Sequence, residues 1–305
     1  MNTEPKKISV KEFAKKLDLE IVFEGKGELS LSTVNVSRPG LQLAGFFDYF
    51  GENRVHVLGN AEMKYYNAKQ SCQKTAVIDA ILKRKVPCTI ISRNLDVPEE
   101  LYQSFIKHET PLFRSKLETT QLVNNLIIFL NDFLAPTTMV HGVFIDVSGV
   151  GVLLTGKSGV GKSETALELI KRGHRFVADD AVLIKNVQNK LFGTAPEVIR
   201  HFMELRGIGI IDTRSLYGVT AVKESKRVDL VIEMVNFDEK KEYDRLDGES
   251  AKETILGVEL PKVVLPVTAG RDMPIVIEAA AANFLLKKSG ISSAKVLLER
   301  TNLGK

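Results

Sequence analysis

The residues with the clearest chemistry form one glycine-rich segment in the middle of the chain. Gly156, Gly161, Lys162 and Ser163 satisfy the pattern Gly-x4-Gly-Lys-Ser of a phosphate-binding P-loop. An apolar strand before the loop and an amphipathic helix after it would aim backbone N–H groups and the helix dipole at one anion. The lysine supplies a mobile positive charge, and the serine hydroxyl is a hard oxygen ligand for Mg²⁺. The expected nucleotide-binding residues are Gly156, Lys157, Ser158, Gly159, Val160, Gly161, Lys162 and Ser163.

Two adjacent carboxylates follow the P-loop at a sequence separation that allows them to return beside it. Asp179 and Asp180 stand 16 and 17 residues after Ser163, at the end of a strand predicted to begin near Phe176. A helix followed by a returning strand would bring that strand end back beside the loop. One carboxylate could then orient Mg²⁺ while the other accepts a proton from an attacking hydroxyl. A solvated acidic turn is the alternative, and the pair by itself leaves both interpretations open.

A third candidate segment combines two charged residues with two glycines in an otherwise apolar stretch. The segment 203–212 contains Gly207 and Gly209, which predict the end of a helix followed by a turn and an apolar strand. Glu204 and Arg206 near this break could reach a metal and a phosphate. A surface salt bridge between glycine caps is the alternative that composition alone favours.

Two further residues carry no clear signal of their own. His141 opens a predicted strand, a position more typical of a buried core histidine than of a reactive one. Arg245 lies in a highly charged stretch, 238–253, and is typical of a solvated face.

The first half of the chain indicates an α/β sandwich. Short apolar strands alternate there with amphipathic helices, and this alternation favours helices packed on a sheet. Pro136 follows the last of these helices and predicts a boundary between a domain at 1–134 and a second at 135–305. The predicted elements are strands at 75–79 and 87–92 and helices at about 98–108 and 119–134.

The second half indicates a P-loop domain with further strands. A hairpin around the glycines near residue 150 is predicted to lead into the loop. Beyond Ser292 a basic terminal helix could dock a partner or pack on the protein itself. The predicted elements are strands at 140–147, 152–155, 176–178, 262–267 and 274–278, a turn at 149–151, and helices from the P-loop to Arg172, at 279–288 and after Ser292.

Composition narrows the class of protein. The 305 residues are 44% hydrophobic and 26% charged, which excludes a disordered, collagen-like or coiled-coil chain. There is no run of about 18 apolar residues and no apolar segment near the start, so we expect no membrane span and no secretory signal. A net charge of +4 is too mild to indicate nucleic-acid binding. We therefore expect a cytoplasmic protein with neither a membrane nor a nucleic acid as its partner.

Taken together, these segments resemble HPr kinase/phosphorylase, a family of bacterial enzymes that phosphorylate a serine of the sugar-phosphotransfer protein HPr. The resemblance runs in order along nearly the whole chain, which a generic P-loop protein would not show. The matching segments are Val36–Leu41, Ala44–Phe50, His141-Gly142, the P-loop 156–163, Ala178–Asp180, Glu204–Asp212 and Tyr243–Leu246.

The resemblance implies a set of roles. Asp180 corresponds to the residue that takes the serine proton in the forward reaction and returns it in the reverse one. The other implied catalytic residues are His141, Lys162 and Arg245, and the implied magnesium ligands are Ser163 and Glu204. ATP or pyrophosphate is the implied donor, HPr the partner, and a hexamer the assembly. The implied fold is an N-terminal α/β sandwich with a C-terminal P-loop kinase domain resembling the phosphoenolpyruvate carboxykinase nucleotide-binding core.

The sequence departs from the family pattern at two places, and it leaves alternative functions open. Thr268-Ala269 stand where the family usually has Arg-Pro, which removes a cation from a segment linked to the reverse reaction. Lys157 stands where an acid is usual and is expected to favour anion binding. A small-molecule kinase or a carboxykinase-like enzyme would share the P-loop but would not need the 204–212 segment or a docking tail. A non-catalytic nucleotide sensor would bind ATP without transferring phosphate to any acceptor.

Overall fold

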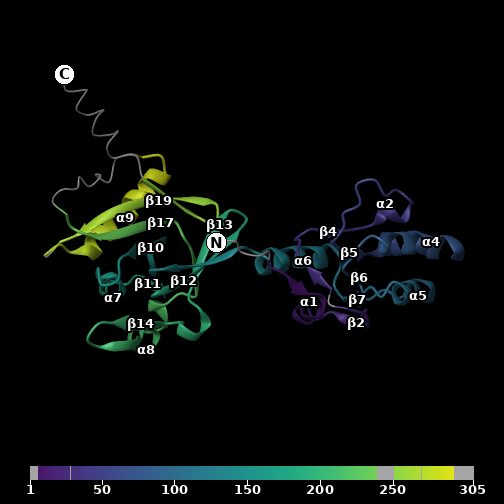
Figure 1. Cartoon of the computed structure of the whole chain (residues 1–305), viewed down its shortest axis with the longest axis horizontal. Coiled ribbons are helices and arrows are strands. Elements are labelled where there is room, and N and C mark those ends of the chain that lie inside the picture. Colours follow the sequence, from purple (N-terminus) through teal and green to yellow (C-terminus); the bar gives the residue numbers. More distant parts are fainter. Residues whose placement is uncertain (1–5, 28, 239–250, 269, 292–305) are drawn as a thin grey trace, which may run out of the picture. The chain divides into compact units, whose positions relative to one another are not determined.

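The chain divides into two compact units, Met1–Pro136 and Thr137–Lys305. The computed structural model describes residues 6–27, 29–238, 251–268 and 270–291. Arg245, Ala269 and the predicted helix after Ser292 lie outside these ranges. In Figure 1 the first unit runs from purple to blue and the second from teal to yellow.

The first unit is built on a five-stranded sheet with the order β2-β7-β6-β5-β4. The four strands from β4 to β7 run parallel, and β2 is antiparallel to β7. A further antiparallel pair, β1 (Ile8–Ser9) and β3 (Ser30–Leu31), stands apart from this sheet. The sheet strands are β2 (Glu20–Phe23), β4 (Val36–Ser37), β5 (Val55–Leu58), β6 (Thr89–Ile91) and β7 (Leu112–Arg114).

Helices cover both faces of this sheet, because the central strands are apolar on both sides. On one face α1 (Val10–Lys16) and α6 (Thr119–Phe133) bury Phe13, Leu126 and Leu130 against β5 and β6. The other helices are α2 (Gly40–Leu43), α3 (Asn60–Asn67), α4 (Ser71–Leu82) and α5 (Glu99–Lys107); α3, α4 and α5 form the second core. The unit is therefore an α/β sandwich, as expected.

One predicted strand in this unit is wrong. Residues 75–79 lie inside α4, not in a strand. Their β-branched and apolar side chains resemble a strand over five residues. Over the whole helix, however, the buried positions are Ile78, Ile81 and Leu82, which have the spacing of a helix face. The predicted strand near 87–92 and the helices near 98–108 and 119–134 are confirmed.

The buried His56 on β5 predicts that the stability of the first unit depends on pH. Its side chain is enclosed beside the Phe50 ring, and neither ring nitrogen has a hydrogen-bond partner among the described residues. Burial, with a smaller contribution from the Arg54 charge, lowers the pKa of His56 from 6.5 to about 4. Below pH 6.5 the unfolded chain binds a proton that the folded chain excludes, so stability is lost as the pH falls towards 4.

Replacing His56 with phenylalanine should remove this dependence. At pH 5 the wild-type protein should have lost about 2 kcal/mol of its pH 7 stability through this group, and the variant should lose none of that share. Calorimetric unfolding of both proteins at pH 7 and pH 5 measures the difference. Identical shifts in the two unfolding temperatures would show that His56 titrates normally.

The second unit contains a six-stranded sheet with the order β11-β9-β10-β17-β19-β18. Its central strands β10, β17 and β19 run parallel, and β9, β11 and β18 join as antiparallel neighbours. The strands are β9 (Val143–Val147), β10 (Val150–Gly156), β11 (Arg175–Ala178), β17 (Leu230–Asn236), β18 (Ala251–Ile255) and β19 (Val258–Val267).

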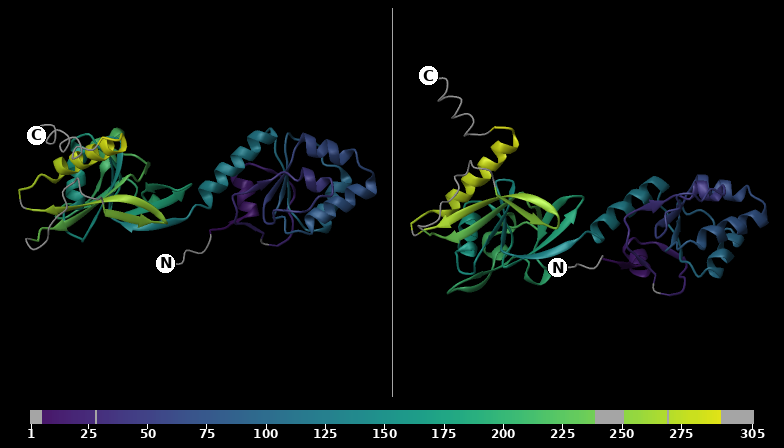
Figure 2. Two further views of the ribbon diagram at one scale, coloured as in Figure 1. Left: turned by 90° about the horizontal axis from the view of Figure 1, so that it is seen from above. Right: turned by 45° about the horizontal axis from the view of Figure 1, so that its top comes forward.

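Successive side chains along the strands of this sheet point to opposite faces and pack into two different hydrophobic cores. Val152 and Leu154 of β10 face α7 (Lys162–Lys171) and α9 (Met273–Lys288), whereas Leu153 between them faces a four-stranded sheet. Figure 2 shows α9, in yellow, lying along one face of the larger sheet. The smaller sheet has the order β16-β13-β12-β8 and consists of β8 (Thr137–His141), β12 (Ala181–Val187), β13 (Lys190–Thr194) and β16 (Ser225–Arg227).

Short elements complete this unit. A two-stranded hairpin joins β14 (Phe202–Leu205) to β15 (Gly209–Asp212), and α8 (Thr213–Tyr217) follows it. Two 3₁₀ turns lie at Glu197–Ile199 and Val219–Ala221. Within the described ranges, no helix combines the length and the apolar run needed to cross a lipid bilayer.

Three local predictions in this unit are wrong. The segment 140–147 is two strands, β8 and β9, because the chain changes sheets at Gly142. The segment 274–278 lies in the first turns of α9, whose start is capped by the Asp272 carboxylate accepting the Ile275 N–H. The segment 203–212 begins in a strand, not at a helix end, although its apolar second strand is confirmed.

Candidate active site

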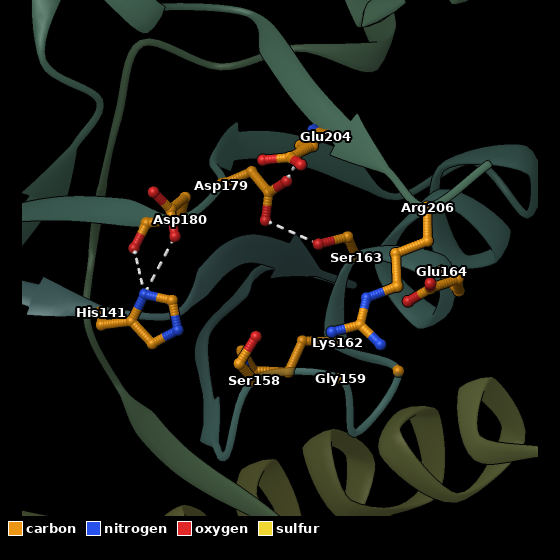
Figure 3. Close-up of a pocket in the computed structure, with 11 residues that line it drawn as sticks. His141, Ser158, Gly159, Lys162, Ser163, Glu164, Asp179, Asp180, Glu204 and Arg206 are labelled. Atoms are coloured by element: carbon orange, nitrogen blue, oxygen red, sulfur yellow. Dashed lines mark hydrogen bonds and ion pairs between the residues drawn. The ribbon is translucent and has the colours of Figure 1, made fainter. Parts of the chain in front are cut away.

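A single pocket of about 170 Å³ gathers most of the polar residues singled out above. It lies where the P-loop, the end of β11 and the β14–β15 hairpin meet (Figure 3). Glycine backbone, two cations and four carboxylates share this small volume, which is the composition expected of a polyphosphate site with an acid–base group. The lining residues are His141, Ser158, Gly159, Gly161, Lys162, Ser163, Glu164, Asp179, Asp180, Glu204 and Arg206.

The P-loop joins β10 to α7 and adopts a conformation that its glycines permit. Gly156, Gly159 and Gly161 have φ angles of 136°, 81° and 95°, all in the range that favours glycine. The side chain of Lys162 folds back over the loop, and its Nζ donates to the carbonyls of Gly156 at 3.0 Å and Lys157 at 3.2 Å. The first residues of α7, from Lys162 to Glu164, line the pocket, and the Lys162 side chain among them is largely buried.

Asp179 is the buried member of the acidic pair. Its Oδ1 accepts a hydrogen bond from the Ser163 hydroxyl at 3.0 Å, and its Oδ2 accepts one from the Glu204 N–H at 3.0 Å. Burial raises the pKa of Asp179 above its ordinary value, although these hydrogen bonds act to lower it. This carboxylate thus ties α7 and the hairpin strand β14 to the end of β11.

Asp180 is the exposed member of the pair, and it contacts His141. The Nδ1 atom of His141 lies 3.0 Å from both Oδ1 and the carbonyl oxygen of Asp180. Both residues stand where the chain leaves one sheet for the other, since β8 leads into β9 and β11 leads into β12. A hydrogen bond from the Gly142 N–H to the Asp180 carbonyl, at 3.1 Å, joins the two crossings.

Most, but not all, of the predicted site residues lie in this pocket. His141 ends β8 with an exposed ring, so the core-histidine interpretation is wrong. Gly156 and Lys157 line a neighbouring pocket together with Thr138 and Lys262, while Val160 is buried beneath the loop. The other P-loop residues, Asp180 and Glu204 meet in one place. Arg245 lies outside the described residues.

Three more side chains line this pocket: Asp179 and Arg206, which the sequence had indicated as candidate metal and phosphate contacts, and Glu164, which it had not. Asp179 was indicated by its position beside Asp180 at the end of a strand, and Arg206 by its position near the glycine break that follows Glu204. For Glu164, which directly follows Ser163 at the start of α7, the sequence offers no comparable signal. Acidic residues are common in the first turn of a helix because they interact favourably with the helix dipole, so Glu164 by itself does not indicate a site.

The donor set fits a magnesium ion held jointly with phosphate. Mg²⁺ prefers hard oxygen ligands and usually takes few of them from protein, the remainder being water and phosphate oxygens. The Ser163 hydroxyl and the Glu204 carboxylate line the same pocket, with Asp179 hydrogen-bonded to both residues. Within the described part of the chain, no cluster of three or more histidine, cysteine or acidic side chains is arranged to hold a metal by itself. Such a site therefore suits an ion that arrives with its phosphates.

Fold and pocket together define a two-domain α/β protein that presents a phosphate-binding loop to several carboxylates. Comparison with known proteins is more specific. The profile of the HPr serine kinase N terminus matches residues 8–130, and that of the HPr serine kinase C-terminal domain matches residues 132–301. This chain therefore belongs to the HPr serine kinase family.

Two relatives that match almost the whole chain agree with this assignment. Proteins named HPr kinase/phosphorylase from Bacillus cereus and Bacillus anthracis are each 45% identical over 296 residues, covering 96% of this chain and 96% of theirs. A solved structure described as the Hpr(Ser) kinase/phosphatase from Coxiella burnetii is 39% identical, covers 50% of this chain and 93% of its own, and has a TM-score of 0.48.

Proposed function

We propose that this protein transfers a phosphoryl group from ATP or pyrophosphate to a serine of HPr and also catalyses the reverse phosphorolysis. The observation that carries the proposal is the 45% identity, over 96% of both chains, to proteins named HPr kinase/phosphorylase. The pocket supports it independently, because it combines a polyphosphate cradle with an exposed carboxylate able to take a proton.

The P-loop would bind the donor phosphates. Loop N–H groups and the start of α7 surround the polyphosphate, and Lys162 turns from its own loop carbonyls to the phosphate oxygens. Phosphoryl transfer needs little covalent help from a protein, so positioning and charge neutralisation supply most of the acceleration. Ser163 and Glu204 would hold Mg²⁺, which when bound neutralises charge on the donor phosphates.

Asp180 is the better placed of the two aspartates to act as the base. Both oxygens of Asp179 already accept hydrogen bonds, and its side chain is buried. Asp180 is 70% exposed at the mouth of the pocket, where an incoming serine hydroxyl can reach it. We therefore assign the proton transfer to Asp180 and the orientation of its carboxylate to His141.

The same groups serve both directions. In the forward reaction the seryl oxygen attacks the terminal phosphorus, the bond to the bridging oxygen breaks, and Asp180 receives the hydroxyl proton. In the reverse reaction inorganic phosphate attacks phosphoserine, pyrophosphate forms, and protonated Asp180 returns the proton to the seryl oxygen. Microscopic reversibility requires one group to act as base and then as acid.

Several finer features belong to this proposal. The second domain is inferred to be a P-loop kinase domain whose nucleotide-binding core is related to that of phosphoenolpyruvate carboxykinase, with the first domain, near residues 1–134, serving assembly or regulation. We expect a cytoplasmic homohexamer in which Arg245 completes the catalytic set. Thr268, which stands in the segment linked to the reverse reaction, offers no cation there.

One assay tests the function. Purified protein, HPr, Mg²⁺ and labelled ATP should yield phosphoserine-HPr, and excess phosphate added afterwards should release pyrophosphate and recover HPr. ATP binding without transfer to HPr would instead indicate a nucleotide sensor. Transfer to a small molecule but not to HPr would indicate a metabolite kinase.

A further inference from the structure

A second pocket adjoins the phosphate pocket at the start of α7. Its volume is about 360 Å³, and it lies between Glu164, Thr165 and Glu168 of α7 and residues 270–274, which lead into α9. Glu164 lines the phosphate pocket as well, so the two pockets meet at this residue. Small-molecule sites commonly have volumes of about 300 to 1,000 Å³. This α7–α9 pocket can therefore hold a part of a ligand that the phosphate pocket does not.

The direction of phosphoryl transfer predicts which part of the donor lies there. In an in-line transfer the attacking and leaving oxygens lie on opposite sides of the transferred phosphorus. Asp180, the proposed base, and His141 lie at one side of the phosphate pocket, and Glu164 lies at the opposite side (Figure 3). The other neighbouring pocket is lined by His141 and so lies on the acceptor side. A donor whose terminal phosphate faces Asp180 therefore extends past Glu164, towards the α7–α9 pocket.

One wall of this pocket suits a ribose. Glu164 and Glu168 are four residues apart on α7, so their exposed side chains share one face of the helix. Among the described residues, neither carboxylate has a hydrogen bond or an ion pair, and like charges at this spacing repel each other. Ionised carboxylates only accept hydrogen bonds, and ribose hydroxyls donate them, as to the acidic residue of dinucleotide-binding folds.

The opposite wall suits a flat ring. Met273 and Pro274, in the first turn of α9, are buried side chains that line the pocket. Arg271 lines it too, and its Nη1 atom donates to the carbonyl oxygen of Pro266 at 3.1 Å. A guanidinium stacks on aromatic rings, and a methionine thioether also packs well against them. A nucleobase beside a ribose matches this combination of an apolar wall and a planar cation.

We propose that the α7–α9 pocket binds the nucleoside of ATP, with Glu168 accepting hydrogen bonds from the ribose hydroxyls. The inference rests on the proposed function, which sets the direction of the donor, and it adds the part of the site that distinguishes ATP from pyrophosphate. Pyrophosphate occupies the phosphate pocket alone, so Glu168 contributes nothing to its binding. The two donors can thus share the transfer groups and differ in affinity through residues that contact no phosphate.

The test compares E168A and E168Q with E197A in the full-length protein. Glu197 is exposed and lines neither pocket, so E197A removes an equal charge and should behave as wild type. E168A should weaken binding of a non-hydrolysable ATP analogue about 10-fold and leave binding of inorganic tripolyphosphate unchanged. The KM for ATP should rise by the same factor, while transfer from pyrophosphate and phosphorolysis keep their rates. E168Q, whose amide oxygen still accepts hydrogen bonds, should lie between wild type and E168A.

A ribose without its hydroxyls provides an independent measurement. Wild-type protein should bind the 2′,3′-dideoxy form of the ATP analogue about 10-fold more weakly than the analogue itself. E168A should bind the two forms equally, because each change removes the same hydrogen bonds. A full 10-fold difference that persists in E168A would show that the ribose lies elsewhere. Equal weakening of the ATP analogue and of tripolyphosphate by E168A would assign Glu168 to the structure of the phosphate site and overturn the inference.

The outcomes distinguish this inference from the function on which it rests. If wild-type protein transfers nothing to HPr from either donor, the function is wrong, and binding of the ATP analogue and of tripolyphosphate still tests the nucleoside site. If wild-type protein phosphorylates HPr and E168A binds the ATP analogue unchanged, the function stands and the nucleoside site is wrong. Glu168 is exposed and alanine favours a helix, so E168A is expected to fold. Should it unfold, the same measurements on E168Q decide.

Discussion

Replacing Lys162 with alanine is expected to abolish phosphoryl transfer in both directions, with kcat/KM falling by about 10³-fold or more. The Nζ atom is held in the pocket within reach of the loop carbonyls of Gly156 and Lys157. In a site with four carboxylates, losing this charge leaves the donor phosphates facing net repulsion. Labelled transfer to HPr and pyrophosphate release measure the two directions separately.

Lys171→Ala provides the matched control for this experiment. Lys171 ends the same helix, α7, and its side chain is exposed, so the substitution removes an equal charge away from the pocket. It should leave both activities near the wild-type level. Thermal unfolding of both variants verifies that neither loses its fold. Substantial activity of the Lys162 variant in either direction would contradict the assignment of the P-loop as the donor site.

Replacing Asp180 with asparagine is expected to preserve ATP binding and remove transfer. Loss of a general base costs about 10² to 10⁴ in rate. The substitution is unusually clean, because Asp180 has a φ angle of 63° and asparagine tolerates that left-handed conformation well. The amide keeps the size of the side chain beside His141 but loses the negative charge and the ability to take a proton.

Nucleotide affinity and single-turnover transfer should be measured on the same preparation of this variant. Unchanged affinity with lost transfer places the defect in the chemical step. Near-normal turnover would show that another group is the base, and Asp179→Asn would then be the variant to examine. Because Asp179 anchors Ser163 and Glu204, we expect its loss to weaken binding as well as rate.

The P-loop and its flanking elements could be predicted from sequence because their pattern is local. Glycine spacing, an apolar strand and an amphipathic helix all lie within about 25 residues, and each constrains the others. Asp179 was expected near the loop because the chain returns to the sheet after α7, and it does return there, although β11 pairs with β9 and not with β10. The contacts of Asp179 with Ser163 and Glu204, and of Asp180 with His141, could not be predicted because they depend on tertiary packing.

Errors arose where local composition conflicted with longer context. The segment 274–278 was predicted to be a strand because it is rich in β-branched residues. Asp272 and Pro274, which are typical of a helix start, were signals for α9 that this prediction did not use. His141 was misread because a strand that ends at a sheet crossing exposes its last residue, and sheet crossings leave no local pattern. Arg206 was indicated as a candidate phosphate contact, and it lines the pocket, but from the turn after β14 and not from a helix end.

The two chain crossings at His141-Gly142 and Asp179-Asp180 have a mechanical consequence. Asp180, the proposed proton acceptor, is supported by the packing of one sheet on the other, through Phe144, Leu153, Val182 and Leu191 in the core between them. Trimming one of these remote side chains should therefore tilt the layers and displace Asp180 from the incoming hydroxyl while the nucleotide cradle, mounted on the opposite face, stays intact. The position of Asp180 in this enzyme then depends on how the two sheets pack on each other as much as on the residues that contact the ligand.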